Sequence, residues 1–297
     1  MPDVGSERFD ADRASGAGYR IDPLNGAPAW IVPDRQGRPM LPVDRCPFCP
    51  GGDAAPDAYD VCAFVNHWPP FPDGRSEVLL HSPDHGATFA SFTPQHARRV
   101  VDLWAERSSA LGARADVDYV LVFENRGPEV GATIDHPHGQ LYAFDVVPPA
   151  VLAEYRAMTT DAFAPDPALV VTRVGTWSAW IAPAPQWPYE LVVAPAGEVP
   201  DLPSLDDTDR DDLARLLVDL AGRLDAFFGE RTPVMTWVHQ RPFDDVDRAP
   251  LRVHVHIAPI RRAPGTTRYV AAGELGSGVW FDPVDPPRAA ADLRDVR

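Results

Sequence analysis

Apolar residues recur every three or four positions in two long stretches of the chain. In the stretch 94–114 this pattern follows Thr93, a residue type that caps helix starts, and the stretch itself opens with proline. In the stretch 208–228 leucine and phenylalanine keep the same spacing, and aspartates near its start suit the helix dipole. We predict an amphipathic helix for each stretch, and a weaker pattern predicts a third helix over 150–162.

Shorter runs rich in β-branched and aromatic residues, each bounded by turn-forming residues, predict β-strands. The runs are 59–66, 76–81, 119–124, 140–144, 170–174, 177–183, 190–194, 234–240 and 252–260. The chain also contains 34 prolines, so many loops are expected between these strands.

The predicted elements occur twice in the same order. Each time a proline-rich segment precedes a strand and a long helix, and then come a second strand, a polar turn and a His-x-His motif. The repeat starts at 66–70 and again at 184–188, and it ends at 136–138 and again at 254–256. We interpret this as an internal duplication into two α+β halves that share one antiparallel sheet with helices packed on it. The expected halves are 19–160 and 161–297.

The composition is that of an ordinary soluble chain with an excess of negative charge. Of the 297 residues, 45% are hydrophobic and 24% are charged, and we find no apolar run long enough to span a bilayer, so no membrane partner is expected. The net charge of -16 opposes binding to a nucleic-acid backbone. Residues 1–18 lack the apolar core of a secretory signal, and we expect a flexible tail there.

The chain contains no lysine, and this absence excludes two kinds of chemistry. A P-loop needs a lysine on the phosphates of its nucleotide. A pyridoxal phosphate enzyme needs a lysine for its Schiff base. An anionic substrate is therefore expected to be held by arginine or by backbone N–H groups.

The segment 123–140 carries the strongest chemical indication. It ends in His-Pro-His-Gly-Gln, residues 136–140, and Pro137 restricts how the two imidazoles can point. An imidazole can act as nucleophile, base or metal ligand near neutral pH, and the glycines of this segment let backbone N–H groups approach an anion. The segment therefore indicates attack by a ring nitrogen on phosphorus. The alternative is a strand end with two hydrogen-bonded histidines.

The three cysteines, Cys46, Cys49 and Cys62, indicate reduced thiols in the cytoplasm. Cys46 and Cys49 form a Cys-x-x-Cys pair, which is either a metal-binding turn or a redox pair. A redox pair is expected near a βαβ pattern, whereas this pair lies in a segment rich in proline and glycine. The setting favours a metal, and Cys62 is expected to be an inert buried thiol.

The duplicated α+β unit that ends in His-Pro-His-Gly-Gln resembles the histidine-triad superfamily. Within it, the chain is similar to the galactose-1-phosphate uridylyltransferases over about 19–283, most strongly in 46–49, 82–85, 123–140, His239 and 254–259. The resemblance implies two histidine-triad-like halves that transfer UMP from a UDP-sugar, UDP-glucose, to a hexose 1-phosphate, galactose 1-phosphate. It also implies a covalent uridylyl-histidine in a ping-pong mechanism, and a homodimer in which the partner completes each sugar site.

The resemblance assigns the nucleophile to His138. At the position of Gln140 the hydrolytic members of the superfamily carry a third histidine that can pass a proton to the leaving group, and glutamine cannot do this. Gln140 is therefore expected to hold a phosphoryl oxygen, which favours transfer over hydrolysis. The resemblance assigns substrate binding to Arg35, Arg38, Phe64, Asn66, Asn125, Gly131, Thr133, Gln140 and Glu274. A solvated charge pair is the alternative for Arg35 and Arg38, and core packing is the alternative for Phe64.

Two metal sites follow from the resemblance. The first set of ligands is Cys46, Cys49, His85 and His136, a closed tetrahedral set typical of structural zinc. The second set is Glu154, His239, His254 and His256, which suits zinc or iron(II). A buried histidine cluster bonded to carboxylates is the alternative for the second set. Both sites are expected to stabilise the fold, and the first is expected to position His138 through Pro137.

The C-terminal segment 269–280 departs from the family pattern. A glutamine that contacts the sugar phosphate is missing, Glu274 matches a ligand for hexose hydroxyls, and 276–278 is expected to form a Gly-Ser-Gly loop that holds phosphate by its backbone. Three other functions stay open. They are a sister transferase or phosphorylase such as ADP-glucose phosphorylase, a nucleotide-binding protein without turnover, and a nucleotide hydrolase.

Overall fold

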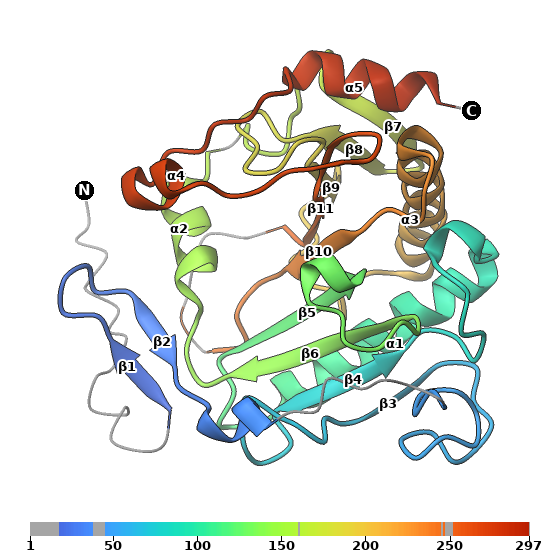
Figure 1. Ribbon diagram of the computed structural model, residues 1–297, viewed down its shortest axis with the longest axis vertical. Coiled ribbons are helices and arrows are strands. Elements are labelled where there is room, and N and C mark those ends of the chain that lie inside the picture. The colour runs from blue at the N-terminus through green and yellow to red at the C-terminus, as the bar shows by residue number, and fades with distance from the viewer. Residues whose placement is uncertain (1–17, 38–44, 160, 245, 247–251, 297) are drawn as a thin grey trace.

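One large antiparallel sheet passes through the middle of the molecule (Figure 1). The computed structural model describes residues 18–37, 45–159, 161–244, 246 and 252–296. Within these residues the sheet has nine strands: β3 (Cys62–Val65), β4 (Ser76–Leu80), β5 (Tyr119–Arg126), β6 (His138–Phe144), β7 (Val170–Val174), β8 (Trp177–Ile181), β9 (Leu191–Pro195), β10 (Val234–His239) and β11 (His254–Pro259). Their order is β3-β4-β6-β5-β10-β11-β9-β8-β7, and every neighbouring pair is antiparallel. The predicted α+β class with one shared antiparallel sheet is confirmed.

Helices pack on both faces of this sheet. They are α1 (Pro94–Gly112), α2 (Pro149–Ala157), α3 (Asp207–Phe228), α4 (Ala272–Ser277) and α5 (Pro286–Asp295). The other described elements are the 3-10 turns η2 (Pro33–Gly37), η3 (Phe89–Ser91) and η4 (Pro128–Val130), and two small sheets, β1 (Tyr19–Ile21) with β2 (Pro28–Trp30) and β12 (Arg261–Ala263) with β13 (Thr266–Thr267). α1 and α3 pack together on one face, and α2 lies on the other. No helix in the described part of the chain is long and apolar enough to cross a membrane.

The two long helices begin close to where they are predicted, because each start has a side-chain cap. The Thr93 hydroxyl accepts a hydrogen bond from the His96 N–H (3.2 Å), and the Asp206 carboxylate accepts one from the Asp209 N–H (2.8 Å). α2 is shorter than predicted, because Met158 is extended and packs on the apolar cluster around Tyr119. α4, α5 and the two small sheets escape prediction, since each is too short for a period to stand out.

The strand order is the same in the two halves when it is followed outward from the middle of the sheet. In the first half it is β5-β6-β4-β3, with α1 between β4 and β5 in the chain. In the second half it is β10-β11-β9-β8, with α3 between β9 and β10. Phe123 of β5 lies opposite Trp237 of β10 at the contact between the halves. The two halves are therefore related by an approximate twofold axis at the β5–β10 contact.

The strand pairing matches the two histidine motifs with a shift of two residues relative to the match made from the sequence. β6 begins at His138 and β11 begins at His254. Gln140 lies opposite Phe123 of β5, and His256 lies opposite Trp237 of β10. His254 is therefore the counterpart of His138, and His256 is the counterpart of Gln140. The match of 136–138 with 254–256 in the sequence is wrong, because a His-x-His pattern fits both registers and only the hydrogen-bonded pairing distinguishes them.

Alternation along the strands separates a core face from a site face. Leu79, Val122 and Leu141 are at most 1% exposed and belong to the apolar cluster that includes α1 and α3, on the core face. A row of directly paired residues crosses the opposite face, here termed the site face: Phe64, Val78, Gln140, Phe123, Trp237, His256, Val192, Trp180 and Val170. Residues from both histidine motifs therefore lie on the site face.

Leu141→Ala is expected to lower the free energy of unfolding by about 2–5 kcal/mol, because Leu141 is fully buried between the sheet and the helices and its truncation leaves a cavity. Urea unfolding followed by circular dichroism measures this loss. Leu24→Ala is the control, since Leu24 is 93% exposed and its truncation is expected to change the same free energy by less than about 0.5 kcal/mol. Equal effects of the two substitutions would contradict the assignment of the core face.

Candidate active site and metal centres

His138 and Gln140 lie at the start of β6 and line a cavity of about 110 Å³ on the site face. The other lining residues are Pro47, Phe48, Ala54, Phe64, Asn66, His67, Trp68, Val78, Thr133 and Ile134. The structure thus brings together five of the residues predicted for catalysis and substrate binding: His138, Gln140, Phe64, Asn66 and Thr133. The lining combines aromatic rings with imidazoles and two amides, a composition that suits a planar heterocycle with polar substituents.

The His138 ring is held in one tautomer. Its Nδ1 lies 2.7 Å from the carbonyl oxygen of His136, and because a carbonyl oxygen only accepts hydrogen bonds, Nδ1 carries the proton. The lone pair of the neutral ring is then on Nε2. Phe48 packs edge-on against the ring, with the two ring centroids 5.1 Å apart. A neutral imidazole in this tautomer can attack an electrophile through Nε2.

The amide of Gln140 is oriented by two neighbours. Asn66 Nδ2 and the Tyr142 hydroxyl each donate to Gln140 Oε1 at 3.4 Å. The amide oxygen is therefore used within the protein, and the N–H groups are the part that can bind an oxygen of a ligand. Because an amide does not titrate, Gln140 can hold an anion but cannot protonate it.

The connection from β5 to β6 forms a tight turn at one end of the sheet, and residues 127–135 of it are here termed the η4 loop. Gly127 has φ 103° and Gly131 has φ 85°, values that favour glycine. A Cβ on Gly127 would lie 2.9 Å from Pro233, so the loop lies directly against the C-terminal half. Asn125, predicted to contact phosphate, lines a second and smaller cavity beside this loop together with His138.

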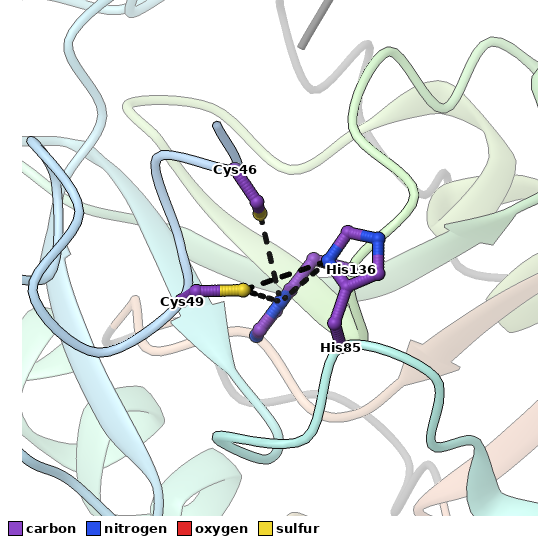
Figure 2. A group of neighbouring side chains, drawn as sticks. All are labelled: Cys46, Cys49, His85 and His136. Atoms are coloured by element: carbon purple, nitrogen blue, oxygen red, sulfur yellow. Dashed lines mark hydrogen bonds between the residues drawn. The ribbon is translucent and has the colours of Figure 1, made fainter. Parts of the chain in front are cut away.

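Four candidate metal ligands converge beside the η4 loop (Figure 2). They are Cys46, Cys49, His85 and His136, here termed the Cys–His group, and their ligand atoms lie within 4.8 Å of one another. His136 Nδ1 is 3.7 Å from the sulfur of each cysteine and 3.4 Å from His85 Nδ1. Cys49 Sγ is 3.6 Å from His85 Nδ1. The first predicted set of ligands is thus assembled in one place.

The chemistry of the Cys–His group suits a cation. Burial lowers the pKa of His136 to about 4, so the ring is neutral at pH 7. Its Nε2 lies 2.8 Å from the Ser82 carbonyl oxygen and therefore carries the proton, which leaves Nδ1 as the ligand atom. Burial, reinforced by Cys46, raises the pKa of the Cys49 thiol. A bound metal ion reverses this effect, because it stabilises the thiolate.

The second predicted set lies on the site face of the C-terminal half and is here termed the Glu–His group. Glu154 of α2 has Oε1 2.8 Å from His239 Nδ1. Its carboxylate is also 3.4 Å from His254 Nε2 and 3.5 Å from His256 Nε2. Among the described residues, Glu154 Oε2 and both ring nitrogens of His256 are buried without a hydrogen-bond partner. A metal ion coordinated by these four residues satisfies the orphaned Glu154 oxygen and one His256 nitrogen.

The protonation states of Glu154 and His239 favour metal binding. Burial opposes ionisation of Glu154, yet the facing imidazoles of His239, His254 and His256 hold the pKa of this carboxyl well below its ordinary value. Burial also lowers the pKa of His239 to about 4. An ionised carboxylate and a neutral imidazole are the forms that coordinate a metal.

Behind β6, His81 and Glu124 form a buried pair on the core face. His81 Nδ1 is 3.6 Å from Glu124 Oε2, and the side chains are 1% and 11% exposed. Burial lowers the pKa of His81 to about 3 and raises the pKa of Glu124 to about 7, so both groups favour their neutral forms below pH 7. A Cβ on Gly139 would lie 2.9 Å from His81 Nε2. Glycine at position 139 therefore leaves room for His81 beside the strand that carries His138.

Two described residues that are predicted to bind substrate are not brought to these cavities. Arg35 lies in η2 and Gly131 caps η4, and neither is among the described lining residues of the two cavities. Arg38 falls outside the described residues, as does nearly all of the expected tail, 1–17. The roles of these residues stay predictions.

Glu274 is engaged within its own segment. It is 5% exposed, its carboxylate accepts hydrogen bonds from the Ala271 N–H (2.8 Å) and the Phe281 N–H (3.0 Å), and Arg268 forms an ion pair with it. These two N–H groups and the guanidinium lower the pKa of Glu274. The loop expected at 276–278 is instead the end of α4, followed by a glycine with φ 70°. That prediction is wrong because Glu274 caps the start of a helix that continues through Gly276 and Ser277.

Three residues that the sequence analysis does not single out contact the candidate metal ligands. The Tyr59 hydroxyl lies 2.9 Å from His136 Nε2. Glu190 Oε1 lies 3.6 Å from His256 Nδ1, and Trp237 stacks on the His256 ring with 4.7 Å between centroids. Each touches a ligand that is distant in sequence, so spacing does not reveal it. The sequence offers a signal for Glu190 alone, because a charged residue at the start of a strand that is expected to be buried needs a partner.

Comparison with known proteins matches both halves. The family model "Galactose-1-phosphate uridyl transferase, N-terminal domain" matches residues 65–148, and the model of the C-terminal domain matches residues 154–273. A galactose-1-phosphate uridylyltransferase from Streptomyces lividans is 35% identical over 314 residues, which cover 93% of this chain and 86% of the relative. A uridylyltransferase structure superposes with a TM-score of 0.85 at 24% identity, over 93% of this chain and 97% of its own. An ADP-glucose phosphorylase from Arabidopsis thaliana with bound ADP-glucose superposes with a TM-score of 0.76 at 21% identity, over 94% and 99%.

The fold and these matches define an enzyme of the uridylyltransferase class, built from two α+β halves that share one sheet. The chain belongs to the galactose-1-phosphate uridylyltransferase family. The family assignment made from the sequence motifs is thereby confirmed. The two solved structures are each below 25% identity and support the fold alone.

Cys46→Ser and Cys49→Ser are each expected to remove about one equivalent of bound transition metal per chain, because serine does not supply a thiolate. Elemental analysis of the purified proteins by plasma mass spectrometry measures the metal content. Cys62→Ser is the matched control, since Cys62 is a free cysteine outside the Cys–His group, and its metal content is expected to equal that of the wild type. Equal metal content in all three variants would rule out the Cys–His group as a metal site.

The raised pKa of Glu124 predicts a stability cost that grows with pH. The unfolded carboxyl ionises near pH 4.5 and the folded one near pH 7, so the folded chain holds an extra proton between these values and its stability falls as the pH rises through this window. Glu124→Gln cannot ionise. It is therefore expected to gain about 2–3 kcal/mol of unfolding free energy relative to the wild type between about pH 5 and about pH 8.

Urea unfolding at the two pH values measures this gain. Glu198→Gln is the control, since the Glu198 side chain is 68% exposed and its difference from the wild type is expected to stay constant. A Glu124→Gln difference that is constant or falls with pH would count against the raised pKa, and a fall would indicate an ion pair with protonated His81.

Proposed function

We propose that this chain transfers UMP between UDP-glucose and galactose 1-phosphate through a covalent uridylyl-histidine on His138. The observation that carries the proposal is the His138 ring, whose Nδ1–H donates to the His136 carbonyl while the lone pair is on Nε2, in a cavity that Gln140 also lines. Family membership supports the reaction class.

In the first step His138 Nε2 attacks the α-phosphorus of UDP-glucose. An N–P bond forms as the bond from that phosphorus to the bridging oxygen breaks, and glucose 1-phosphate leaves with the electron pair. A sugar phosphate is a good leaving group and departs without a proton from the protein, in agreement with the non-titrating Gln140. The ring becomes positively charged, and the His136 carbonyl oxygen stabilises its Nδ1–H.

In the second step a phosphate oxygen of galactose 1-phosphate attacks the same phosphorus. The N–P bond breaks, its electron pair returns to His138 Nε2, and UDP-galactose leaves. Each displacement inverts the phosphorus, so the two steps together retain its configuration. In a chain without lysine, the amide of Gln140 and backbone N–H groups of the η4 loop outside its internal turn replace water around the phosphates.

The cavity lining supports a nucleotide on the donor side. Phe64 and Trp68 offer aromatic faces to a pyrimidine ring. The Asn66 amide bridges this wall and the catalytic strand, because its oxygen accepts from the Trp68 N–H at 2.8 Å and its nitrogen donates to Gln140 at 3.4 Å. A nucleotide that contacts Asn66 can therefore change the orientation of the Gln140 amide, beside the nucleophile.

Zinc fits the Cys–His group. Tetrahedral zinc has bonds of about 2.3 Å to sulfur and about 2.0–2.1 Å to nitrogen, which set two nitrogens about 3.3 Å apart and a nitrogen and a sulfur about 3.6 Å apart. The corresponding separations are 3.4 Å between the imidazoles and 3.6 Å or 3.7 Å between nitrogen and sulfur. When bound, zinc would supply rigidity here, because Cys46, Cys49, His85 and His136 would hold it and the carbonyl of His136 orients His138. Zinc or iron(II) suits the Glu–His group in the same structural role.

The proposal extends to assembly and organisation. We propose catalytic and metal-stabilised halves over 19–160 and 161–297, and a homodimer in which the partner completes the sugar site. Exposed apolar residues around α4 support a contact surface there, since Tyr269 is 82% and Leu275 is 73% exposed. Under this proposal the enzyme works in the cytoplasm, where its thiols stay reduced.

Intact mass spectrometry after mixing the protein with UDP-glucose, in the absence of acceptor, tests this function. The expected result is a mass gain of one UMP in the wild type and none in His138→Ala, because the N–P bond cannot form without the imidazole. Galactose 1-phosphate is expected to discharge the adduct. His96→Asn is the control, since His96 lies in the first turn of α1 outside the lining of the site cavity, and it is expected to keep the adduct.

The same experiment with ADP-glucose separates the alternatives. A gain with ADP-glucose alone keeps the histidine chemistry and assigns the chain to the phosphorylase type, whose fold it shares. Tight nucleotide binding with no adduct from either donor would contradict the transfer reaction and favour a binding protein.

A further inference from the structure

The η4 loop is tied to the C-terminal half at both of its ends by arginine. Before the loop begins, Arg126, the last residue of β5, donates to Asp225 of α3 at 2.8 Å. At the other end Asp135 lies 3.3 Å from Arg231, which precedes β10. These ion pairs connect positions far apart in sequence, and each joins the loop of one half to the body of the other.

A third contact between the halves holds the tip of the η4 loop, the turn η4 itself, through a single guanidinium. Arg261 of β12 donates from Nη2 to Glu129 Oε1 at 3.0 Å and from Nε to Glu230 Oε1 at 2.5 Å, and it also donates to the Thr267 hydroxyl. The Arg261 side chain is 10% exposed, whereas those of Glu129 and Glu230 are 39% and 34% exposed. The arginine is therefore the buried centre of this group, and the two glutamates neutralise it.

The chemistry of this third contact requires arginine. A guanidinium is planar and has five N–H donors in a fixed fork, so it can bond two carboxylates and a hydroxyl at once. Glu230 and Glu129 raise the pKa of Arg261, so it stays charged. One carboxylate comes from the η4 loop and the other from the α3–β10 connection, so Arg261 fixes the distance between these two segments.

Packing alone gives the tip of the loop little support. η4 contains no buried residue. Internal turn hydrogen bonds run from the Gly131 N–H to Pro128 O at 3.1 Å and from the Ala132 N–H to Gly127 O at 3.2 Å, and they shape the turn without attaching it to the sheet. A loop with few apolar contacts opens at low free energy unless polar ties hold it. The contacts of Arg261 and Glu129 supply such a tie at the tip.

We infer that Arg261 is a positioning residue, which holds the η4 loop in the conformation that attack by His138 requires. This inference rests on the proposed function, in which that loop receives the phosphates. It gives the C-terminal half a part in the transfer, since this half aligns the loop of the half that carries the nucleophile.

Arg261→Met tests the inference, because methionine keeps an apolar stem and removes the charge and the hydrogen bonds. Amides of residues 127–132 are expected to exchange hydrogen for deuterium faster, as measured by mass spectrometry. The single-turnover rate of UMP adduct formation at saturating UDP-glucose is expected to fall roughly tenfold or more, because a small displacement of aligned groups costs much of the rate. Arg261→Lys is expected to recover part of this rate, since an ammonium cannot reproduce the fork.

Glu129→Gln is expected to act in the same direction, and adding it to Arg261→Met is expected to cause no further loss, because both changes break one tie. Arg98→Met is the matched control. Arg98 of α1 also joins the halves, through Asp207 at 2.6 Å and Asp211 at 2.7 Å, but it lies among the helices of the core face. It is expected to lower the unfolding midpoint and to leave the loop exchange and the adduct rate unchanged.

Unchanged loop exchange in Arg261→Met overturns the inference, and so does an equal increase of loop exchange in Arg98→Met. Failure of the proposed function looks different. If the wild type takes up no UMP, the transfer reaction fails, while the exchange comparison still decides whether Arg261 holds the loop.

Discussion

The antiparallel pairing of β5 with β10 is the constraint on which the rest of the structure depends. It joins the strands of both halves into one sheet, with Phe123 opposite Trp237. Such a pairing fixes the register along its whole length, since a slip of one residue moves every side chain to the other face. The strand β6, which carries His138, pairs with β5, and the strand β11, which carries His254 and His256, pairs with β10. Both sites therefore take their position from this contact.

At corresponding positions in the two halves, the same kind of hydrogen bond to a backbone carbonyl orients a histidine ring, although the surroundings of the two rings differ. His138 Nδ1 lies 2.7 Å from the carbonyl oxygen two residues before it, and its counterpart His254 Nδ1 lies 2.8 Å from the carbonyl oxygen of Arg252. In each case the hydrogen bond leaves Nε2 as the reactive nitrogen. The surroundings then determine what each imidazole can bind. Glu154 faces His254, whereas a cavity lined by aromatic rings adjoins His138. The fold thus supplies an oriented imidazole, and neighbouring elements assign its task.

Residue type and period are enough to predict the long helices and the strands of the large sheet, and the family resemblance adds the two groups of candidate metal ligands that the structure brings together. Turn residues mark the strand ends, and thiols and imidazoles are few enough to be grouped by type. Contacts between distant segments are not predictable in this way. Nothing local marks Arg261 as the partner of Glu129, which is 132 positions away. Glu274 shows the same limit, since nothing local indicates that a carboxylate expected to bind sugar also caps a helix.

The shared sheet also bears on how the two copies could diverge after duplication. Separated halves would each expose β5 or β10 as an open edge, a surface on which chains aggregate. Selection therefore acts on the two copies jointly at their common strands, and more independently elsewhere. The exchange of an amide at Gln140 for an imidazole at His256 is a divergence of this kind, because both side chains occupy the same place in the row across the sheet. Because one continuous sheet pairs both strands, a change of side chain in this row alters the chemistry of one half and leaves neither β5 nor β10 as an open edge.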